Sequence, residues 1–396
     1  MFSDQTLLAL AGRPPISIGS PINMPVERAS TILCPTVEAM EKNEAFPSML
    51  GNVCYGALGT GNAFALCDAI NRLEEGAGTV LLGSGLASCV MSLLSFVTAG
   101  DHVLMTDAVY GPQKEFCTDI LSRFGVETTF YDPALDAVAL EKLIKANTRV
   151  LYAESPASQT FEMQDIPALA EAAHRRNVLL MTDNTWGGPL CFKPLAHGAD
   201  ICIEAVTKFI AGHSDLVMGA VTARTEELYR RIRLFCIQTG QVASPDDCYL
   251  ALRGLRTMKV RMEAQFKTAL SLSAWLDTRP EVERVFFPPL PNDPGHLLWQ
   301  RDFHGGGALF SIALRHGYSH EAVCAMLNSY RYFSLGASWG GYASLVQLCH
   351  PERSDFNSSR DWIKSHALIR FAVGLEDETD LRHDLENGFQ RLAQCL

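Results

Sequence analysis

The chain has 396 residues, 47% of them hydrophobic, which is enough apolar material for a large core and about two or three domains. Its formal net charge of -11 argues against nucleic acid or an anionic membrane as a partner, since both require a basic face. The 12 cysteines occur singly without metal-ligand spacing, and no apolar run reaches the roughly 20 residues of a membrane helix. We therefore expect a cytoplasmic protein with reduced thiols and no bound metal.

Residues 1–59 are rich in proline and lack sustained periodicity, which predicts an irregular N-terminal arm that reaches a neighbouring subunit. From residue 60 to residue 245, helical periodicity alternates with short apolar runs, which predicts a mainly parallel sheet covered by helices on both faces. The expected strands are Thr79–Leu82, His102–Met105, Glu127–Tyr131, Arg149–Ala153, Leu179–Asp183, Ile201–Val206 and Leu216–Thr222.

A glycine-rich turn, Gly83-Ser84-Gly85, follows the first of these strands and opens a helical run through Phe96. Free backbone amides at a helix start would face an anion, so a phosphate would fit there. The same turn begins a GxGxxG-like pattern with Asp107 about 20 residues further on, which leaves a dinucleotide site as an alternative. Against that alternative, the third glycine position is Ser88.

Tyr110 follows the second expected strand, so its ring could reach the carboxyl edge of the sheet and stack on a planar cofactor. An ordinary core tyrosine is the alternative at this position. Lys114 and Glu115, a few residues further along, are candidates for contacts to the far end of a substrate.

A lysine and an aspartate lie at the ends of two other expected strands, Asp183 closing Leu179–Asp183 and Lys208 following Ile201–Val206. Ligands of open parallel sheets bind outside the carboxyl ends of the strands, so the two side chains should meet. This pair suits pyridoxal phosphate (PLP): the lysine amine binds the aldehyde covalently, and the carboxylate keeps the pyridine nitrogen protonated. Taken singly, each has an ordinary alternative, a strand-end aspartate and a surface lysine.

Residues 246–396 mix helices with short strands and predict a smaller α/β domain. A long helical stretch runs from Ala251 to Leu276, and the expected strands include Gly307–Ile312 and Ile369–Val373. Arg370 lies in the last of these, where its planar guanidinium could bind a substrate carboxylate with two hydrogen bonds. A structural ion pair is the alternative for this arginine.

Several segments in unbroken order resemble the cysteine and methionine metabolism family of PLP-dependent enzymes, from about residue 27 to the C-terminus. They include Tyr55-Gly56-Ala57-Leu58-Gly59-Thr60, Ser84-Gly85-Leu86-Ala87, Glu154-Ser155-Pro156, Asp183-Asn184-Thr185-Trp186, Thr207-Lys208, Gly212-His213-Ser214-Asp215 and Ser338-Trp339-Gly340-Gly341-Tyr342. The resemblance implies the fold-type I, aspartate-aminotransferase-like architecture and a homotetramer of two dimers, with active sites at the dimer interface. It also implies a carbon-sulfur β-lyase that acts on cystathionine or a related cysteine thioether and releases a thiol, pyruvate and ammonia.

The resemblance also assigns roles to single residues. It makes Lys208 the covalent anchor of PLP, Asp183 the partner of the pyridine nitrogen and Tyr110 the stacking ring, all three catalytic. Gly85, Leu86 and Thr207 would hold the cofactor phosphate, and Tyr55 would reach the phosphate of the adjacent subunit. Arg370 with Ser338 and Trp339 would seat the substrate α-carboxylate.

The chain departs from the family pattern at four positions. An arginine that binds the cofactor phosphate across the dimer is replaced by Ala57, and a second arginine by Leu58. Two tyrosines expected near the distal end of the substrate are replaced by Ile237 and Ala337. These losses leave three alternatives open: γ-elimination or γ-replacement on homoserine derivatives, racemisation, and a cofactor-binding scaffold without turnover.

Overall fold

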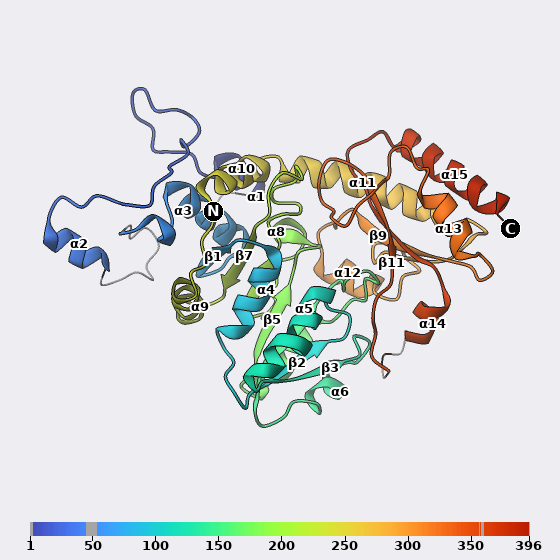
Figure 1. Cartoon of the computed structure of the whole chain (residues 1–396), viewed down its shortest axis with the longest axis horizontal. Coiled ribbons are helices and arrows are strands. Elements are labelled where there is room, and N and C mark those ends of the chain that lie inside the picture. Colours follow the sequence, from blue (N-terminus) through green and yellow to red (C-terminus); the bar gives the residue numbers. More distant parts are fainter. Residues whose placement is uncertain (1–2, 45–53, 356, 358–359, 396) are drawn as a thin grey trace.

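The computed structural model describes residues 3–44, 54–355, 357 and 360–395. Within this part of the chain the strands form two sheets, one of seven strands in the order β1-β7-β6-β5-β4-β2-β3 and one of five in the order β10-β11-β12-β9-β8. The smaller sheet lies on the C-terminal side of the molecule (Figure 1).

The larger sheet is mainly parallel, as the alternating pattern predicted. Its strands are β1 (Gly78–Leu82), β2 (His102–Thr106), β3 (Glu127–Tyr131), β4 (Thr148–Glu154), β5 (Leu179–Asp183), β6 (Ile201–Glu204) and β7 (Gly219–Ala223). β2 to β6 pair in parallel, whereas β7 is antiparallel to both of its neighbours, β6 and β1. The carboxyl ends of the parallel strands therefore share one edge.

The described residues also form helices, before, between and after the strands of the two sheets. They are α1 (Asp4–Leu10), α2 (Val37–Glu44), α3 (Gly61–Glu74), α4 (Gly85–Leu94), α5 (Gly111–Glu115), α6 (Ala137–Glu141), α7 (Ile166–Arg175), α8 (Gly188–Cys191), α9 (Glu226–Gln238), α10 (Pro245–Leu255), α11 (Met258–Leu276), α12 (His296–Asp302), α13 (His320–Leu327), α14 (Arg360–Ser365) and α15 (Glu378–Gln394). The expected helical stretch from Ala251 to Leu276 is divided between α10 and α11.

The two faces of the larger sheet bury separate apolar clusters because successive side chains of a strand point to opposite sides. In β1, Val80 and Leu82 join the cluster that contains residues of α4 and α9, whereas Leu81 joins the cluster that contains residues of α3 and α7. β2 divides in the same way, with Val103 on the first face and Leu104 on the second. Helices thus cover both faces, as predicted.

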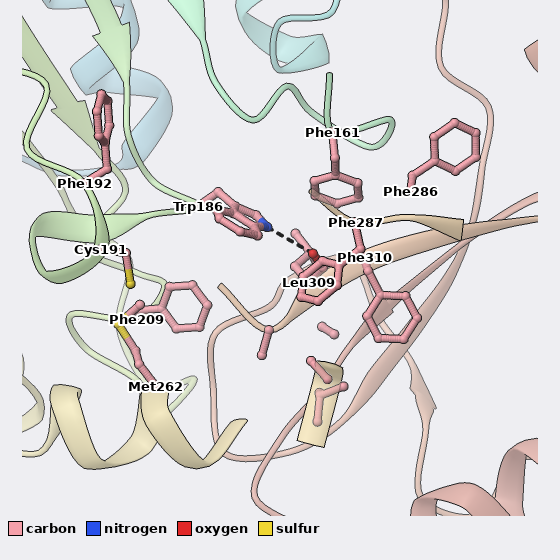
Figure 2. Close-up of a cluster of buried hydrophobic side chains, with 14 of the residues drawn as sticks. Phe161, Trp186, Cys191, Phe192, Phe209, Met262, Phe286, Phe287, Leu309 and Phe310 are labelled. Atoms are coloured by element: carbon pink, nitrogen blue, oxygen red, sulfur yellow. Dashed lines mark hydrogen bonds between the residues drawn. The ribbon is translucent and has the colours of Figure 1, made fainter. Parts of the chain in front are cut away.

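The smaller sheet consists of β8 (Val282–Phe286), β9 (Leu309–Leu314), β10 (Ser334–Leu335), β11 (Leu345–Cys349) and β12 (Leu368–Ala372). Aromatic side chains join it to the larger sheet (Figure 2). Trp186, which follows β5, donates from Nε1 to the carbonyl of Leu309 on β9 at 3.0 Å, and its ring lies 6.2 Å from that of Phe287 in an edge-to-face arrangement. This aromatic cluster holds the larger and the smaller sheet together.

The N-terminal segment is more ordered at its start than the sequence pattern predicted. α1 packs against α3, and its Leu8 is only 1% exposed. The segment beyond it carries the exposed Ile16, Ile18 and Leu33 and projects from the body with α2 (Figure 1). Residues 45–53 of the expected arm lie outside the described residues. The arm's contact with a neighbouring subunit and the domain boundaries near residues 59 and 245 stay predictions.

Several strand ends differ from the sequence expectation, by one to three residues. β6 ends at Glu204, because the chain turns at Ala205 and the amide of Lys208 donates to the carbonyl of Ala205. β7 begins at Gly219 rather than Leu216, and β9 at Leu309 rather than Gly307. The apolar runs continue past the strands into irregular segments, and periodicity alone cannot distinguish these flanking residues from strand.

Candidate active site

Lys208 lies in the turn that follows β6 and extends its amine into a cavity of about 240 Å³ at the carboxyl edge of the larger sheet. Its Nζ donates to Ser338 Oγ at 2.9 Å and lies 5.3 Å from the centre of the Trp339 ring. Burial, with a smaller effect of the Arg370 charge, lowers the pKa of Lys208 to about 8. The amine therefore gives up its proton more readily than a surface lysine.

Asp183, the last residue of β5, lines the same cavity. Its Oδ1 accepts the amide of Thr185 at 2.9 Å, and its Oδ2 lies 3.8 Å from the Cys89 thiol. Burial raises the pKa of Asp183, although the hydrogen bonds from Thr185 and Cys89 and the Lys208 charge oppose the shift. Among the described residues no cation lies within ion-pair distance of this carboxylate, so it is available to a cationic ligand group.

The first turn of α4 forms another side of the cavity, and its backbone amides point to the start of the helix. The Ser84 hydroxyl caps the helix by accepting the amide of Ala87 at 3.0 Å, while the amides of Gly85 and Leu86 have no partner within the helix. A Cβ on Gly85 would lie 2.7 Å from the Cβ of Ala205, so only glycine lets the helix start approach the turn before Lys208. This geometry suits a phosphate.

Tyr110 borders the opposite side of the cavity and is 42% exposed. The ordinary core tyrosine is thereby excluded, and the ring is free to face a ligand. The amide of Tyr110 donates to Glu154 Oε2 at 2.7 Å, which ties the loop after β2 to the end of β4. Burial raises the pKa of Tyr110, and the negative charges of neighbouring groups, Asp183 among them, raise it further.

Arg370 on β12 supplies the remaining charge in the cavity. Its Nη2 donates to the Ala337 carbonyl at 3.0 Å and to Gln347 Oε1 at 2.6 Å, both neutral groups. Arg370 is 8% exposed and, within the described part of the chain, has no carboxylate partner, which argues against the structural ion pair. A buried cation with neutral neighbours is suited to an anionic ligand.

The remaining predicted site residues divide into two groups. Ser338 and Trp339 contact Lys208, as described above, and Thr207 lines the cavity. The hydroxyl of Thr207 donates to the Met218 carbonyl at 3.0 Å, so it would have to give up that bond to donate to a phosphate. Tyr55 is 53% exposed and is not part of the cavity wall of its own chain.

Sequence reasoning missed several side chains that line the cavity, among them Glu154, Cys89 and Val217. Glu154 had a usable signal, since it closes a buried strand in the same way as Asp183. Cys89 follows Gly85 by four residues, so both lie on one face of α4. Val217, which is 59% exposed, lies in the irregular segment before β7, and no local pattern distinguishes its position.

The structure argues against two alternatives that involve the loop after β2. Asp107 would be the ribose ligand of a dinucleotide site, but its carboxylate is fully buried and accepts hydrogen bonds from Lys114 and Ser354. Lys114 itself pairs with Asp107 and does not line the cavity, so it makes no contact with the far end of a substrate there. The same holds for Glu115.

Of the four residues that depart from the family pattern, one lines the cavity and three do not. Ala337 lines the cavity and presents no polar side-chain group to it. Ala57 and Leu58 belong to a short helical turn after Tyr55, and Ile237 belongs to α9. None of these three contributes to the cavity wall of the same chain.

The residues of the cavity fit PLP in three respects. The α4 start offers unpaired amides and a glycine-only approach for a phosphate, and Asp183 offers a buried carboxylate for a pyridinium. Lys208 offers an amine of lowered pKa on the same cavity wall. Within the described residues no cluster of side chains could hold a metal ion, and no helix is both long and apolar enough to span a bilayer.

Comparisons with known proteins also indicate a PLP-dependent enzyme. Residues 5–390 match the family described as Cys/Met metabolism PLP-dependent enzyme. Cystathionine beta-lyase of Bordetella avium is 39% identical over 393 residues, covering 98% of both chains, and cystathionine beta-lyase MetC of Escherichia coli is 38% identical over 391 residues with the same coverage. The crystal structure of metB from Corynebacterium glutamicum superposes with a TM-score of 0.89 at 28% identity, covering 99% of this chain and 98% of that one.

Fold and site together define a PLP-dependent enzyme of fold type I, with a mainly parallel central sheet and a smaller C-terminal α/β part. The chain belongs to the Cys/Met metabolism family of PLP-dependent enzymes.

Proposed function

We propose that this enzyme cleaves the bond between sulfur and the β-carbon of a cysteine thioether, cystathionine or a related compound, and releases a thiol, pyruvate and ammonia. The observation that carries the proposal is the convergence of Lys208, Asp183 and Arg370 on one cavity, each from a different strand end or strand. The relatives that are named cystathionine beta-lyases over nearly their whole length support the same reaction.

Arg370 orients the substrate in this proposal. Its buried guanidinium, now bonded only to neutral oxygens, accepts the α-carboxylate, and Ser338 and Trp339 border that position next to Lys208. A carboxylate can accept two parallel hydrogen bonds from a guanidinium, which adds an ion pair and a fixed orientation that neutral oxygens do not provide. Binding at this point places the α-carbon near Lys208 Nζ.

Lys208 moves the proton. Its Nζ removes the α-proton of the bound amino acid, a step for which its pKa of about 8 is better suited than that of a free lysine. Bound PLP supplies the electron sink for the pair left on the α-carbon, and the Asp183 carboxylate is placed to hold the proton of the pyridine nitrogen. The β-carbon then loses the thiolate, and the released 2-aminoacrylate reacts with water to give pyruvate and ammonium.

The walls of the cavity favour an apolar substrate tail. Around the charged groups named above, the lining includes Pro156, Ala157, Val217, Leu309 and Ala337. A distal ammonium or carboxylate buried against such walls without partners loses several kcal/mol. We therefore expect S-alkyl cysteines to have a higher kcat/KM than cystathionine; a clear preference for cystathionine would refute this argument about the tail.

A homotetramer of two dimers, with active sites at the dimer interface, is part of the proposal. Tyr55 is half exposed and away from its own cavity, and the segment before it exposes Ile16, Ile18, Ile22 and Leu33. Exposed apolar side chains along one segment support its contact with another subunit. The cysteines of the described residues are all free, which is consistent with the proposed cytoplasmic location.

The experiment that tests the proposed reaction is a product assay with purified holoenzyme, cystathionine and a series of S-alkyl cysteines. Pyruvate and thiol released in equal amounts are the expected result. Formation of 2-oxobutyrate or a new thioether would indicate chemistry at the γ-carbon, and an inverted amino acid would indicate racemisation. Absence of every product with a fully loaded cofactor site would leave only a binding scaffold.

A further inference from the structure

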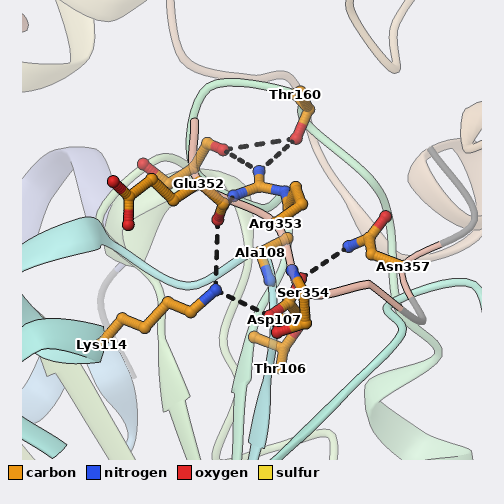
Figure 3. A network of polar contacts seen from close by, with 10 residues as sticks. Thr106, Asp107, Ala108, Lys114, Thr160, Glu352, Arg353, Ser354 and Asn357 are labelled. Atoms are coloured by element: carbon orange, nitrogen blue, oxygen red, sulfur yellow. Dashed lines mark hydrogen bonds and ion pairs between the residues drawn. The ribbon is translucent and has the colours of Figure 1, made fainter. Parts of the chain in front are cut away.

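A polar network at the rim of the cavity joins the two sheets and is not part of the machinery described above. Its centre is Asp107, whose side chain is fully buried directly after β2 (Figure 3). Asp107 accepts hydrogen bonds from Lys114 Nζ at 2.8 Å, from the amide and hydroxyl of Ser354 at 2.9 and 2.6 Å, and from Asn357 Nδ2 at 3.0 Å. Lys114 also donates to the carbonyl of Glu352 at 3.2 Å.

Residues 352–354, which follow β11, also bind the loop that follows β4 at the rim of the cavity. Arg353 is 9% exposed, and its Nη2 donates to Thr160 Oγ1 at 2.8 Å and to the Ser158 carbonyl at 3.2 Å. The amide of Ser158 in turn donates to the carbonyl of Ala108 at 3.1 Å. Residues 352–354 follow β11 of the smaller sheet and bind two loops of the larger sheet, the one after β2 and the one after β4. This segment therefore holds the two loops together at the rim of the cavity.

Tyr110 lies inside the loop that this network closes. The Asp107–Lys114 ion pair joins two residues that are seven positions apart, one on each side of Tyr110, and Glu154 accepts the amide of Tyr110 between them. Lys114 is only 17% exposed, and its Nζ also lies 5.1 Å from the centre of the Phe130 ring. Burial alone would raise the pKa of Asp107, but the hydrogen bonds from Lys114 and Ser354 outweigh it and lower the pKa. The buried carboxylate therefore remains charged and needs its cation.

We propose that Asp107, Lys114 and residues 352–354 form a rim latch, through which the smaller sheet positions the Tyr110 ring over the cavity. Lys114 and Asp107 are positioning residues that contact neither substrate nor cofactor. The functional part of this inference rests on the proposed role of Tyr110, whereas its structural part, the immobilisation of the loop, does not.

The test compares Lys114→Met with Lys145→Met. Methionine keeps most of the apolar stem of Lys114 over Phe130 and removes its charge, which leaves the Asp107 carboxylate buried without a cation. The control breaks the Lys145–Glu127 ion pair on the same sheet, in which both side chains are substantially exposed, 42% and 58%. Exposed pairs of this type contribute little.

Hydrogen exchange of the cofactor-free proteins gives a readout that needs no turnover. In Lys114→Met, amides of residues 107–111 and 352–354 should exchange about tenfold faster, while the core strands keep wild-type rates. Unchanged exchange in both segments, or an equal rise across the whole chain, would overturn the latch. If Lys114→Met fails to fold, Ser354→Ala removes a single donor to Asp107 and should give the same local pattern.

Measurements on the PLP-loaded variants distinguish a positioning role of this network from a purely structural one. Lys114→Met should change the visible circular dichroism of the bound cofactor and lower kcat by about tenfold, because a displacement of about 1 Å at a reacting site costs up to about a hundredfold. Lys114→Arg, which keeps the charge, should restore both values, and Lys145→Met should alter neither. A lower melting temperature with unchanged dichroism and kcat would mean that the network is structural only. Faster loop exchange without a change in kcat would contradict the role of Tyr110 and leave the latch in place.

Discussion

Replacement of Gly85 by alanine should weaken the binding of PLP without unfolding the protein. The added Cβ would lie 2.7 Å from the Cβ of Ala205, far inside the ordinary contact range that begins at 3.4 Å. Both atoms belong to rigid elements, the start of α4 and the turn before Lys208, so neither can rotate away. The helix start must shift, and the amides of Gly85 and Leu86 shift with it.

The magnitude follows from two opposing effects. Alanine favours a helix over glycine by up to about 1 kcal/mol, which partly protects the stability of the fold. Overpacking of this kind costs about 1–3 kcal/mol, and hydrogen bonds to the phosphate weaken steeply when their donors move out of line. We expect most of this cost to appear in cofactor binding, as a rise in Kd of roughly 5- to 150-fold.

The assay is a titration of the cofactor-free proteins with PLP, followed by the quenching of tryptophan fluorescence. Gly83→Ala is the matched control from the same turn, since its nearest new contact would be the Val242 carbonyl at 3.9 Å. That variant should bind PLP with the wild-type Kd. A Gly85→Ala protein with unchanged Kd and melting temperature would refute the placement of the phosphate at α4.

Two other perturbations test charges at the site. Ala57→Arg should slow the loss of PLP during dialysis, because it adds a charge-assisted hydrogen bond to the phosphate across the proposed dimer; unchanged retention would mean that another cation already provides it. Lys208→Met should stabilise the cofactor-free protein near pH 7, because burial lowers the pKa of Lys208 from 10.5 to about 8 and the wild-type fold must hold the charged amine there. The unfolded chain binds more protons between these two pKa values, so wild-type stability should rise with pH across that window, and the difference in melting temperature should shrink from about pH 7 to about pH 10. A difference that stays constant with pH would contradict the lowered pKa.

The sequence was sufficient to predict the larger sheet and the edge at which the site lies. β3 and β5 have the predicted bounds: β5 is mainly apolar, whereas β3 is marked by its threonine and aromatic residues, which favour strands. Asp183 and Lys208 could be placed in one cavity because the parallel order of neighbouring strands brings their carboxyl ends together. Local periodicity and one topological rule thus accounted for the centre of the site.

The rim could not be predicted in the same way. Asp107 and Ser354 are separated by 247 residues, and no periodic pattern relates a loop after β2 to a loop after β11. The burial of Asp107 also depends on Lys114, so a sequence that suggested a ribose ligand or a substrate contact in fact encodes an ion pair. Long-range packing decides such positions, and local propensity carries no information about it.

The most direct test of the central claim is reductive trapping of the cofactor in the holoenzyme with borohydride, followed by peptide mapping by mass spectrometry. Our account predicts that the added mass of the reduced cofactor is found on Lys208, the lysine whose amine shares the cavity with Asp183. Its appearance on another lysine, such as Lys193, or the absence of any trapped cofactor, would contradict the assignment of the site.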